Sequence, residues 1–166
     1  MTITNRVVLA AIALCMLLTV SASGQEVILQ GKPYDAFVKT NATTLFFGST
    51  PVAATTPIQN IKCPKSSHCF FRIDLSTQLD GLTSGGLVAG YVTVSGPGSI
   101  DVLPYNSLGI DATYSGDLTQ TRGITWMTGT VGPGVYTVTV YLNTVVDGAT
   151  AGSFSRTLGV EVYLEH

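Results

Sequence analysis

The most regular alternation of hydrophobic and polar residues in this chain lies near its C-terminus. Valine and leucine alternate with threonine and tyrosine over residues 135–142, and a similar alternation returns over residues 157–165. A period of two places the apolar side chains on one face, which is typical of a half-buried antiparallel strand. The loop between the two runs contains the turn signal Asp147-Gly148, so we expect them to pair as the final hairpin of the fold.

Shorter runs of the same kind fill the chain after residue 25. Glycine, proline, asparagine and aspartate separate these runs, and almost no segment has the period of an amphipathic helix. About seven to nine short strands at this spacing predict a single all-β domain, an antiparallel β-sandwich. The further strands are predicted at residues 36–47 (one bent strand or two), 69–75, 87–95, 100–103, 110–114 and 122–131, with a connector at 49–57.

One segment resembles a known family pattern. Residues 131–136, Val-Gly-Pro-Gly-Val-Tyr, precede the alternating threonines and valines and resemble the tyrosine corner of fibronectin type III and related immunoglobulin-like domains. In that corner the tyrosine hydroxyl bonds backward to the backbone where the chain changes sheets. The resemblance implies an immunoglobulin-like sandwich in which Tyr136 holds the corner and Trp126 belongs to the core. It implies an architecture and no activity.

The N-terminus departs from the β pattern. Residues 7–20 form an unbroken apolar run that follows Arg6 and precedes the small residues Ala22 and Gly24. This order is typical of a secretory signal peptide. The run is about 14 residues long, shorter than the roughly 20 that a transmembrane helix needs. We therefore predict a cleaved signal peptide at residues 1–24. The mature domain, residues 25–166, would be secreted or periplasmic and would contain no membrane span.

Two alternatives stay open at this end of the chain. Cleavage after Ala22 also satisfies the preference for small residues. Lipid attachment at Cys15 would require a small residue before it, where the chain has Leu14, and the apolar run continues past Cys15. Both alternatives still direct the domain out of the cytosol.

The charge of the chain is low and scattered. Only 11% of the residues are charged, and the formal net charge is −2. Removal of Arg6 leaves seven basic side chains against ten acidic ones, a formal charge of −3. Because no basic stripe is present to neutralise phosphates, we expect no nucleic-acid partner. We expect the partner to be another extracellular protein or a surface polymer.

Export leaves two cysteines, Cys63 and Cys69. An even number in an oxidising compartment predicts a disulfide. The loop that it closes is short, so the chain-entropy model assigns it only about 2 kcal/mol. We expect the bond to fix a local loop and not to join the two sheets, unlike the bridge of antibody domains.

Few residues in the mature chain could carry catalysis. His68, beside Cys69, is the one histidine apart from the terminal His166. Zinc needs three or four ligands, and oxidised cysteines cannot supply them. A serine hydrolase needs a nucleophile, a base and an acid, and the chain has no Gly-X-Ser-X-Gly elbow. We therefore predict no enzyme activity, no cofactor and no metal site, with a small secreted hydrolase as one alternative.

The acidic and amide side chains leave further possibilities open. A paired-carboxylate enzyme could use the aspartates, although most of them lie where they would cap turns. Loop carboxylates could bind calcium, and the candidates are Asp111, Asp117 and Asp147. The triplet Asn41-Ala42-Thr43 matches the N-glycosylation signal, which matters only in a host that glycosylates it.

Exposed aromatic residues are the remaining binding signal. Tyr105 and Tyr114 fall in or near predicted loops, and Tyr141 and Tyr163 are predicted as outward-facing neighbours on the final hairpin. Such tyrosines can stack on sugars or anchor a protein interface. We favour a secreted, non-catalytic β-sandwich that acts as a structural, adhesive or protein-recognition module. The alternative is a carbohydrate-binding domain that uses these tyrosines.

A free sheet edge would give such a module a physical route to its partner. An extended segment of the partner can add to an exposed edge strand through backbone hydrogen bonds. We expect a suitable edge to be flat or apolar and to lack lysine and proline. The last strand, residues 157–165, carries two glutamates and would be partly protected.

Overall fold

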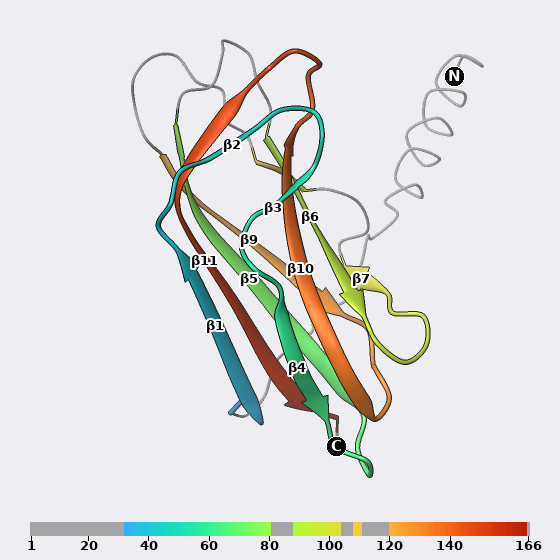
Figure 1. The fold of residues 1–166 in the computed structure, drawn as a ribbon. Coiled ribbons are helices and arrows are strands. Elements are labelled where there is room, and N and C mark those ends of the chain that lie inside the picture. The colour runs from blue at the N-terminus through green and yellow to red at the C-terminus, as the bar shows by residue number, and fades with distance from the viewer. Residues whose placement is uncertain (1–31, 81–87, 104–107, 111–119, 166) are drawn as a thin grey trace, which may run out of the picture. The chain divides into compact units, whose positions relative to one another are not determined.

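The part of the chain that the structure describes contains β-strands and their connections, and no helix (Figure 1). The computed structural model describes residues 32–80, 88–103, 108–110 and 120–165. These residues fall within one compact unit, Gly31–His166. None of them forms a helix that could cross a membrane. The predicted signal peptide, residues 1–24, lies outside the described residues.

The first sheet has six strands, and every pairing in it is antiparallel. Its order is β1-β11-β5-β9-β7, and β2 pairs with β11 as well. The last strand, β11, is therefore an interior strand and not an edge. The strands are β1 (Asp35–Asn41), β2 (Leu45–Phe47), β5 (Cys69–Asp80), β7 (Val102–Leu103), β9 (Gln120–Thr128) and β11 (Ala151–Leu164).

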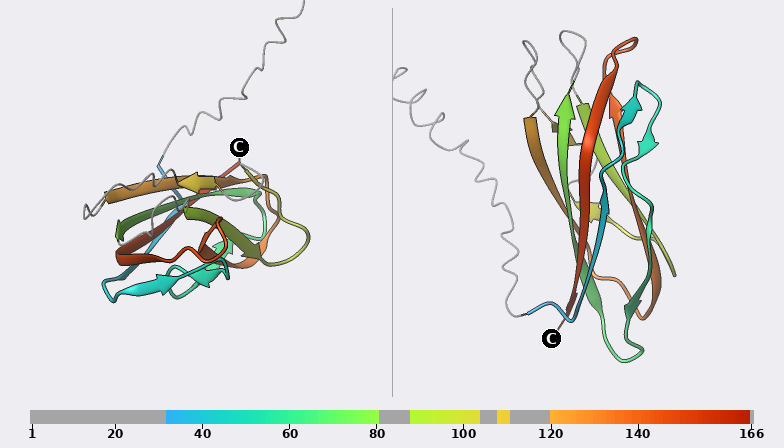
Figure 2. Two further views of the ribbon diagram at one scale, coloured as in Figure 1. Left: turned by 90° about the horizontal axis from the view of Figure 1, so that it is seen from above. Right: turned by 60° about the vertical axis from the view of Figure 1, so that its left-hand side comes forward.

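The second sheet has five strands and is also antiparallel. Its order is β3-β10-β6-β8, and β4 lies beside β10 as well. The view from above in Figure 2 shows the two sheets packed face to face. The all-β sandwich that the strand pattern predicts is thus confirmed. The strands are β3 (Val52–Ala53), β4 (Ile58–Cys63), β6 (Val88–Ser95), β8 (Leu108–Ile110) and β10 (Gly134–Thr144).

The core lies between the sheets and follows the predicted alternation. Val138, Val140 and Leu142 of β10 are fully buried, and Thr139 and Tyr141 between them are only partly so. The first sheet contributes the buried side chains that face them. These are Leu158, Val160 and Val162 of β11 and Cys69, Phe71, Ile73 and Leu75 of β5. Trp126 of β9 is 1% exposed, so it belongs to the core as the resemblance implies.

The predicted final hairpin is wrong, because β10 and β11 lie in different sheets. Residues Thr137–Thr144 of β10 pair with Val88–Ser95 of β6. Strand β11 instead pairs with β5 along most of its length and with β1 on its other side. In immunoglobulin-like domains the last two strands share one sheet, so the strand order departs from that pattern here. Alternation assigns a side chain to a face, but it does not select the neighbouring strand.

Strand β4 lies beyond the predicted connector and was not expected from the alternation. Its buried residues Ile58 and Ile61 are three positions apart, which breaks the period of two. Between them Asn60 has a positive φ of 61°. The pairing with β10 shifts register at this point, as in a β-bulge. Residues 36–47 form two strands, β1 and β2, which was one of the two predicted forms.

Candidate functional site

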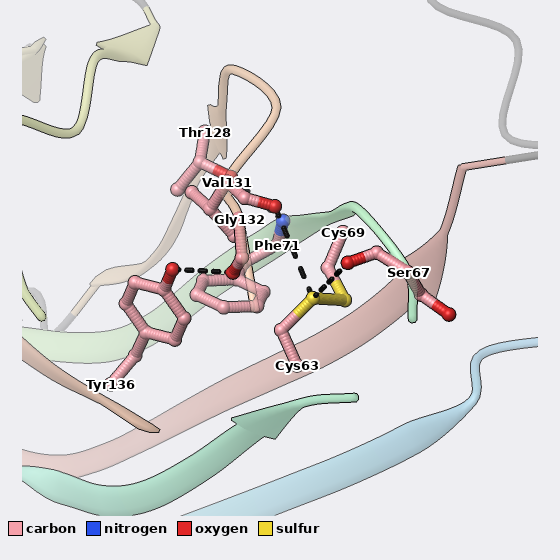
Figure 3. The surroundings of a disulfide bond; sticks show 8 residues. All are labelled: Cys63, Ser67, Cys69, Phe71, Thr128, Val131, Gly132 and Tyr136. Atoms are coloured by element: carbon pink, nitrogen blue, oxygen red, sulfur yellow. Dashed lines mark hydrogen bonds between the residues drawn. A yellow bond between two sulfur atoms is a disulfide. The ribbon is translucent and has the colours of Figure 1, made fainter. Parts of the chain in front are cut away.

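The disulfide between Cys63 and Cys69 is confirmed, and it joins the two sheets (Figure 3). Cys63 ends β4 in the second sheet, and Cys69 begins β5 in the first. Their Cα atoms are 5.9 Å apart, and both side chains are buried. The expectation that this bond only fixes a local loop is therefore wrong. The five residues between the cysteines are the connection by which the chain crosses from one sheet to the other.

Tyr136 closes the same end of the core (Figure 3). Its hydroxyl donates to the Gly132 carbonyl at 2.6 Å, the backward bond that the tyrosine-corner resemblance implies. Its ring meets the ring of Phe71 edge to face, with centroids 5.2 Å apart. A methyl group on Gly96 would clash with the Tyr136 ring, so the turn after β6 must approach closely there. Burial raises the pKa of Tyr136. Tyr136 is an anchor of the fold.

Two of the four tyrosines predicted as a binding surface are described by the structure, and these two do not come together. Tyr141 of β10 stacks on Tyr91 of β6, with ring centroids 5.0 Å apart. Tyr163 of β11 stacks on Phe70 of β5, with ring centroids 5.4 Å apart. Because β10 and β11 belong to different sheets, the prediction that Tyr141 and Tyr163 are neighbours is wrong. Tyr105 and Tyr114 lie outside the described residues.

Tyr163 is held in a polar network on the outer face of the first sheet. Its side chain is only 7% exposed, and its hydroxyl donates to Glu161 at 2.7 Å. Arg72 lies 3.8 Å from Glu161 and 3.0 Å from Asp74. The hydrogen bond to Glu161, followed by burial and the charge of Glu161, raises the pKa of Tyr163. The network orders the surface, and it leaves little of the Tyr163 ring for a ligand.

Those candidate catalytic and metal-binding residues that the structure describes do not form a cluster. His68 is exposed in the loop between the cysteines, and its carbonyl accepts from the Glu165 N–H at 2.9 Å. Across the described ranges, no three histidine, cysteine or acidic side chains come together as metal ligands would. Asp147 is exposed in a turn, and the other calcium candidates, Asp111 and Asp117, lie outside the described residues.

The alternation did not predict a buried cation, Arg156. This side chain of β11 is 1% exposed, and burial lowers its pKa. It donates to the carbonyls of Ala54 at 2.5 Å, Ser153 at 2.6 Å and Thr43 at 2.7 Å. Arg156 thereby ties the connector after β1 and the connector after β3 to the interior strand of the first sheet. Its position two residues before the buried Leu158 is the signal that could have indicated an inward side chain.

Strand β1 forms one edge of the first sheet and is the strongest candidate for an interaction site. It pairs with β11 from Asp35↔Val162 to Asn41↔Arg156, and no described strand pairs with its outer side. Phe37 packs partly against the core, whereas Val38 is 67% exposed. Strand β2 continues this edge with Phe46, which is 74% exposed. The edge therefore combines backbone groups that no described strand pairs with and exposed apolar side chains. One of these groups, the Ala36 N–H, donates to Asp35 Oδ1 at 2.9 Å.

The hydrogen-bonding side of each β1 residue follows from the neighbouring strands. Cys69 and Val131 exchange backbone hydrogen bonds of 2.9 and 2.7 Å, so the polar groups of Cys69 point away from β11. Successive residues of a strand point these groups to opposite sides. Even-numbered residues of β5 therefore bond to odd-numbered residues of β11, which leaves the even-numbered residues of β11 to bond to β1.

The same reasoning assigns the two sides of β1. Asp35, Phe37 and Lys39 stand opposite even-numbered residues of β11, so their N–H and C=O groups bond inward to that strand. The N–H and C=O groups of Ala36, Val38 and Thr40 face the open edge. These three residues are the positions at which another strand could bond.

A groove of about 490 Å³ runs along this edge between the two sheets. Residues 36–39 of β1 line one side of it, and residues 57–60 at the start of β4 line the other. Figures 1 and 2 show β1 and β4 at the same side of the sandwich. The bulge at Asn60 interrupts β4, and bulges protect sheet edges from pairing. A strand that entered this groove would therefore pair with β1 and not with β4.

The β1 edge differs from the predicted one in two respects. It is β1, a strand that we did not single out as an edge, whereas the last strand, expected to be partly protected by its glutamates, lies in the interior. It also carries Lys39, whereas we expected an edge without lysine. The glycosylation triplet lies at its end, where Asn41 Oδ1 accepts from the Thr43 N–H at 2.9 Å and from the Thr43 hydroxyl at 2.6 Å.

Comparison of the sequence with protein-family models and with curated proteins finds no match.

Proposed function

We propose that this protein is an exported, non-catalytic β-sandwich module that assembles with a protein partner by strand addition at β1. The observation that supports this proposal most is the outer side of β1. Three successive bonding positions, Ala36, Val38 and Thr40, present backbone groups to which no described strand pairs. An extended segment laid along them would gain a ladder of hydrogen bonds and would cover Val38.

The proposed export of the protein is supported by two further features. The buried Cys63–Cys69 bond suits an oxidising compartment. The apolar run near the N-terminus, which is followed by small residues, suits a signal peptide. Together they support export to the periplasm or beyond the cell, where the partner would be another extracellular protein.

The carbohydrate-binding alternative receives no comparable support. A sugar platform needs aromatic faces that lie together and open to solvent. Tyr141 and Tyr163 each have a ring stacked on one face, and they lie on different sheets. We therefore retain the assembly module as the proposed function.

The test compares the exported wild-type chain with two variants at Val38. Val38→Pro removes an N–H that faces the open edge and leaves the bonds to β11 in place, whereas Val38→Thr keeps that N–H. Full-length chains are expressed in cells that export them, and the exported material is fractionated by size and by retention on the cell surface. We expect the wild type and Val38→Thr to be recovered in assemblies or on cells, and Val38→Pro to be recovered as free monomer. Equal recovery of all three would contradict the proposal.

A further inference from the structure

The sequence of β1 is complementary to itself when two copies run antiparallel. In the order Asp35, Ala36, Phe37, Val38, Lys39, an acidic residue and a basic residue lie at equal distances on either side of Phe37. Reversal of this segment therefore places aspartate opposite lysine twice, alanine opposite valine twice, and phenylalanine opposite phenylalanine. We infer that the partner of the β1 edge is a second copy of this chain, joined through β1 across a two-fold axis at Phe37. This inference rests on the proposed use of that edge.

The required hydrogen-bonding pattern agrees with this register. The backbone groups that face the open edge belong to Ala36, Val38 and Thr40, so an antiparallel partner must set even-numbered residues opposite even-numbered residues. The Ala36 N–H is held by Asp35 Oδ1 at 2.9 Å, and a partner strand would have to replace this bond. With Phe37 on the axis, Ala36 of each copy meets Val38 of the other. Asp35 and Lys39 then stand at non-hydrogen-bonded positions, where opposed side chains lie closest.

Neighbouring registers satisfy the backbone but lose the charge pairing. With Val38 on the axis, Asp35 stands opposite Asn41, and Lys39 opposite Phe37. With Ala36 on the axis, Asp35 stands opposite Phe37, and Lys39 opposite Pro33. Only the register centred on Phe37 sets each charge directly opposite its counterion, so the charges select that register.

Lys39 would make the β1 edge selective for a second copy in this arrangement. A lysine on an edge strand discourages pairing with apolar strands, because its charge would be buried against them. Asp35 of a second copy removes that penalty in one register only. The edge can thus pair with itself and still resist unrelated strands.

The side chains on both faces of β1 suit the same contact. Phe37 is partly buried on the inner face, and across the axis it would meet the Phe37 ring of the other copy. On the outer face, Val38 is 67% exposed and would pack against Ala36 of the other copy. The second copy of β1 would follow the groove between β1 and β4. One strand per copy makes a small interface, so we expect a dissociation constant of about 10–100 μM.

The first test measures dimerisation of the purified mature chain, residues 25–166, by sedimentation equilibrium. Lys39→Asp and Asp35→Lys each set like charges opposite one another at two positions, and we expect each to weaken dimerisation about tenfold or more. The double variant, Asp35→Lys with Lys39→Asp, restores opposite charges, and we expect its dissociation constant to return to within about threefold of the wild type. Lys65→Asp makes the same charge change in an exposed loop and should change nothing.

The second test checks the register. A chain that carries Asp35→Cys is mixed with a chain that carries Lys39→Cys under mild oxidation. Opposed residues at such positions lie about 4.5 Å apart between Cα atoms, within the range that a disulfide needs. We expect an intermolecular crosslink in the mixture and none in either variant alone. Both substitutions are at exposed positions, so folding is expected to be retained.

These outcomes separate the inference from the proposed function. A wild type that stays monomeric at millimolar concentration overturns the inference. So does a double variant whose dimerisation remains as weak as that of the single charge variants. Crosslinks that form equally in each cysteine variant alone also overturn it. If Val38→Pro still abolishes assembly of the exported chain in that case, the proposed function stands with a different partner. If the chain dimerises as described but Val38→Pro leaves its export assemblies intact, the inference stands and the proposed function fails.

Discussion

Cys63 and Cys69 are six positions apart in the chain, yet their disulfide connects the two sheets of the sandwich. The bond sits at the end of the core where Tyr136 also anchors its corner, and the side chains of both cysteines are buried. A short loop therefore contributes a link between layers that antibody domains obtain from cysteines far apart in sequence.

Removal of this disulfide should lower the stability of the fold. The double variant Cys63→Ala with Cys69→Ala is expected to lose about 2 kcal/mol of unfolding free energy, because the short loop is no longer closed in the unfolded chain. The measurement is urea unfolding with and without a reductant. The reductant should reproduce the loss in the wild type and have no effect on the double variant. If the reductant leaves the unfolding midpoint of the wild type unchanged, the bond is not formed.

Tyr136→Phe should destabilise the protein although it removes a single oxygen atom. The variant leaves the Gly132 carbonyl without its donor at the buried corner, so we expect a loss of about 1–2 kcal/mol in unfolding free energy. Tyr34→Phe is the matched control, since Tyr34 is 54% exposed and should tolerate the change. Equal stabilities of the two variants would mean that the corner hydrogen bond contributes nothing.

Arg156→Met should be among the most damaging changes of a charged residue. It removes a guanidinium that three backbone carbonyls share, and it leaves the buried carbonyls of Ala54 and Ser153 unpaired, so we expect a loss of about 3 kcal/mol or more. Arg72→Met is the control, because the Arg72 side chain is 41% exposed and its ion pairs are worth about 1 kcal/mol or less. Chemical unfolding of both variants measures the difference. A larger loss in Arg72→Met would overturn this account of Arg156.

Alkaline pH should destabilise the fold through Tyr163. Its pKa is raised in the folded state above the ordinary value of 10.0, because the neutral hydroxyl donates to Glu161. Folding therefore favours the protonated form, and this stabilisation is complete below pH 10 and is lost as the pH rises through the folded-state pKa. Urea unfolding between pH 8 and about pH 11 should show a smaller decline in Tyr163→Phe and in Glu161→Gln than in the wild type. Parallel declines in all three would exclude Tyr163 as a cause.

The alternation of apolar and polar residues was sufficient to predict the faces of the main strands. Every second side chain of β5, β10 and β11 that the pattern assigns to the core is indeed buried or packed against it. The pattern was insufficient where a local irregularity broke the period. In β4 the bulge at Asn60 sets Ile58 and Ile61 three positions apart, and the strand was missed.

The candidate site was only partly accessible from the sequence. The idea of a free edge that adds a strand follows from an all-β composition, but the identity of the edge does not. We expected the last strand to be partly protected by its two glutamates, and the structure sets that strand in the interior between β1 and β5. The exposed backbone positions of β1 follow only once the hydrogen bonds of three neighbouring strands are known.

By itself, the sequence determined the fold class, the inward side of the regular strands and the pairing of Cys63 with Cys69. These properties depend on local periodicity and on the small number of cysteines. Only the tertiary structure decided that β10 and β11 lie in different sheets and that the disulfide connects the two sheets. It also decided that the Arg156 side chain is buried and bonds to backbone carbonyls. The reason is physical: a side chain's face depends on neighbours one and two residues away, whereas the choice of a pairing strand depends on hydrogen bonds and packing over the whole domain.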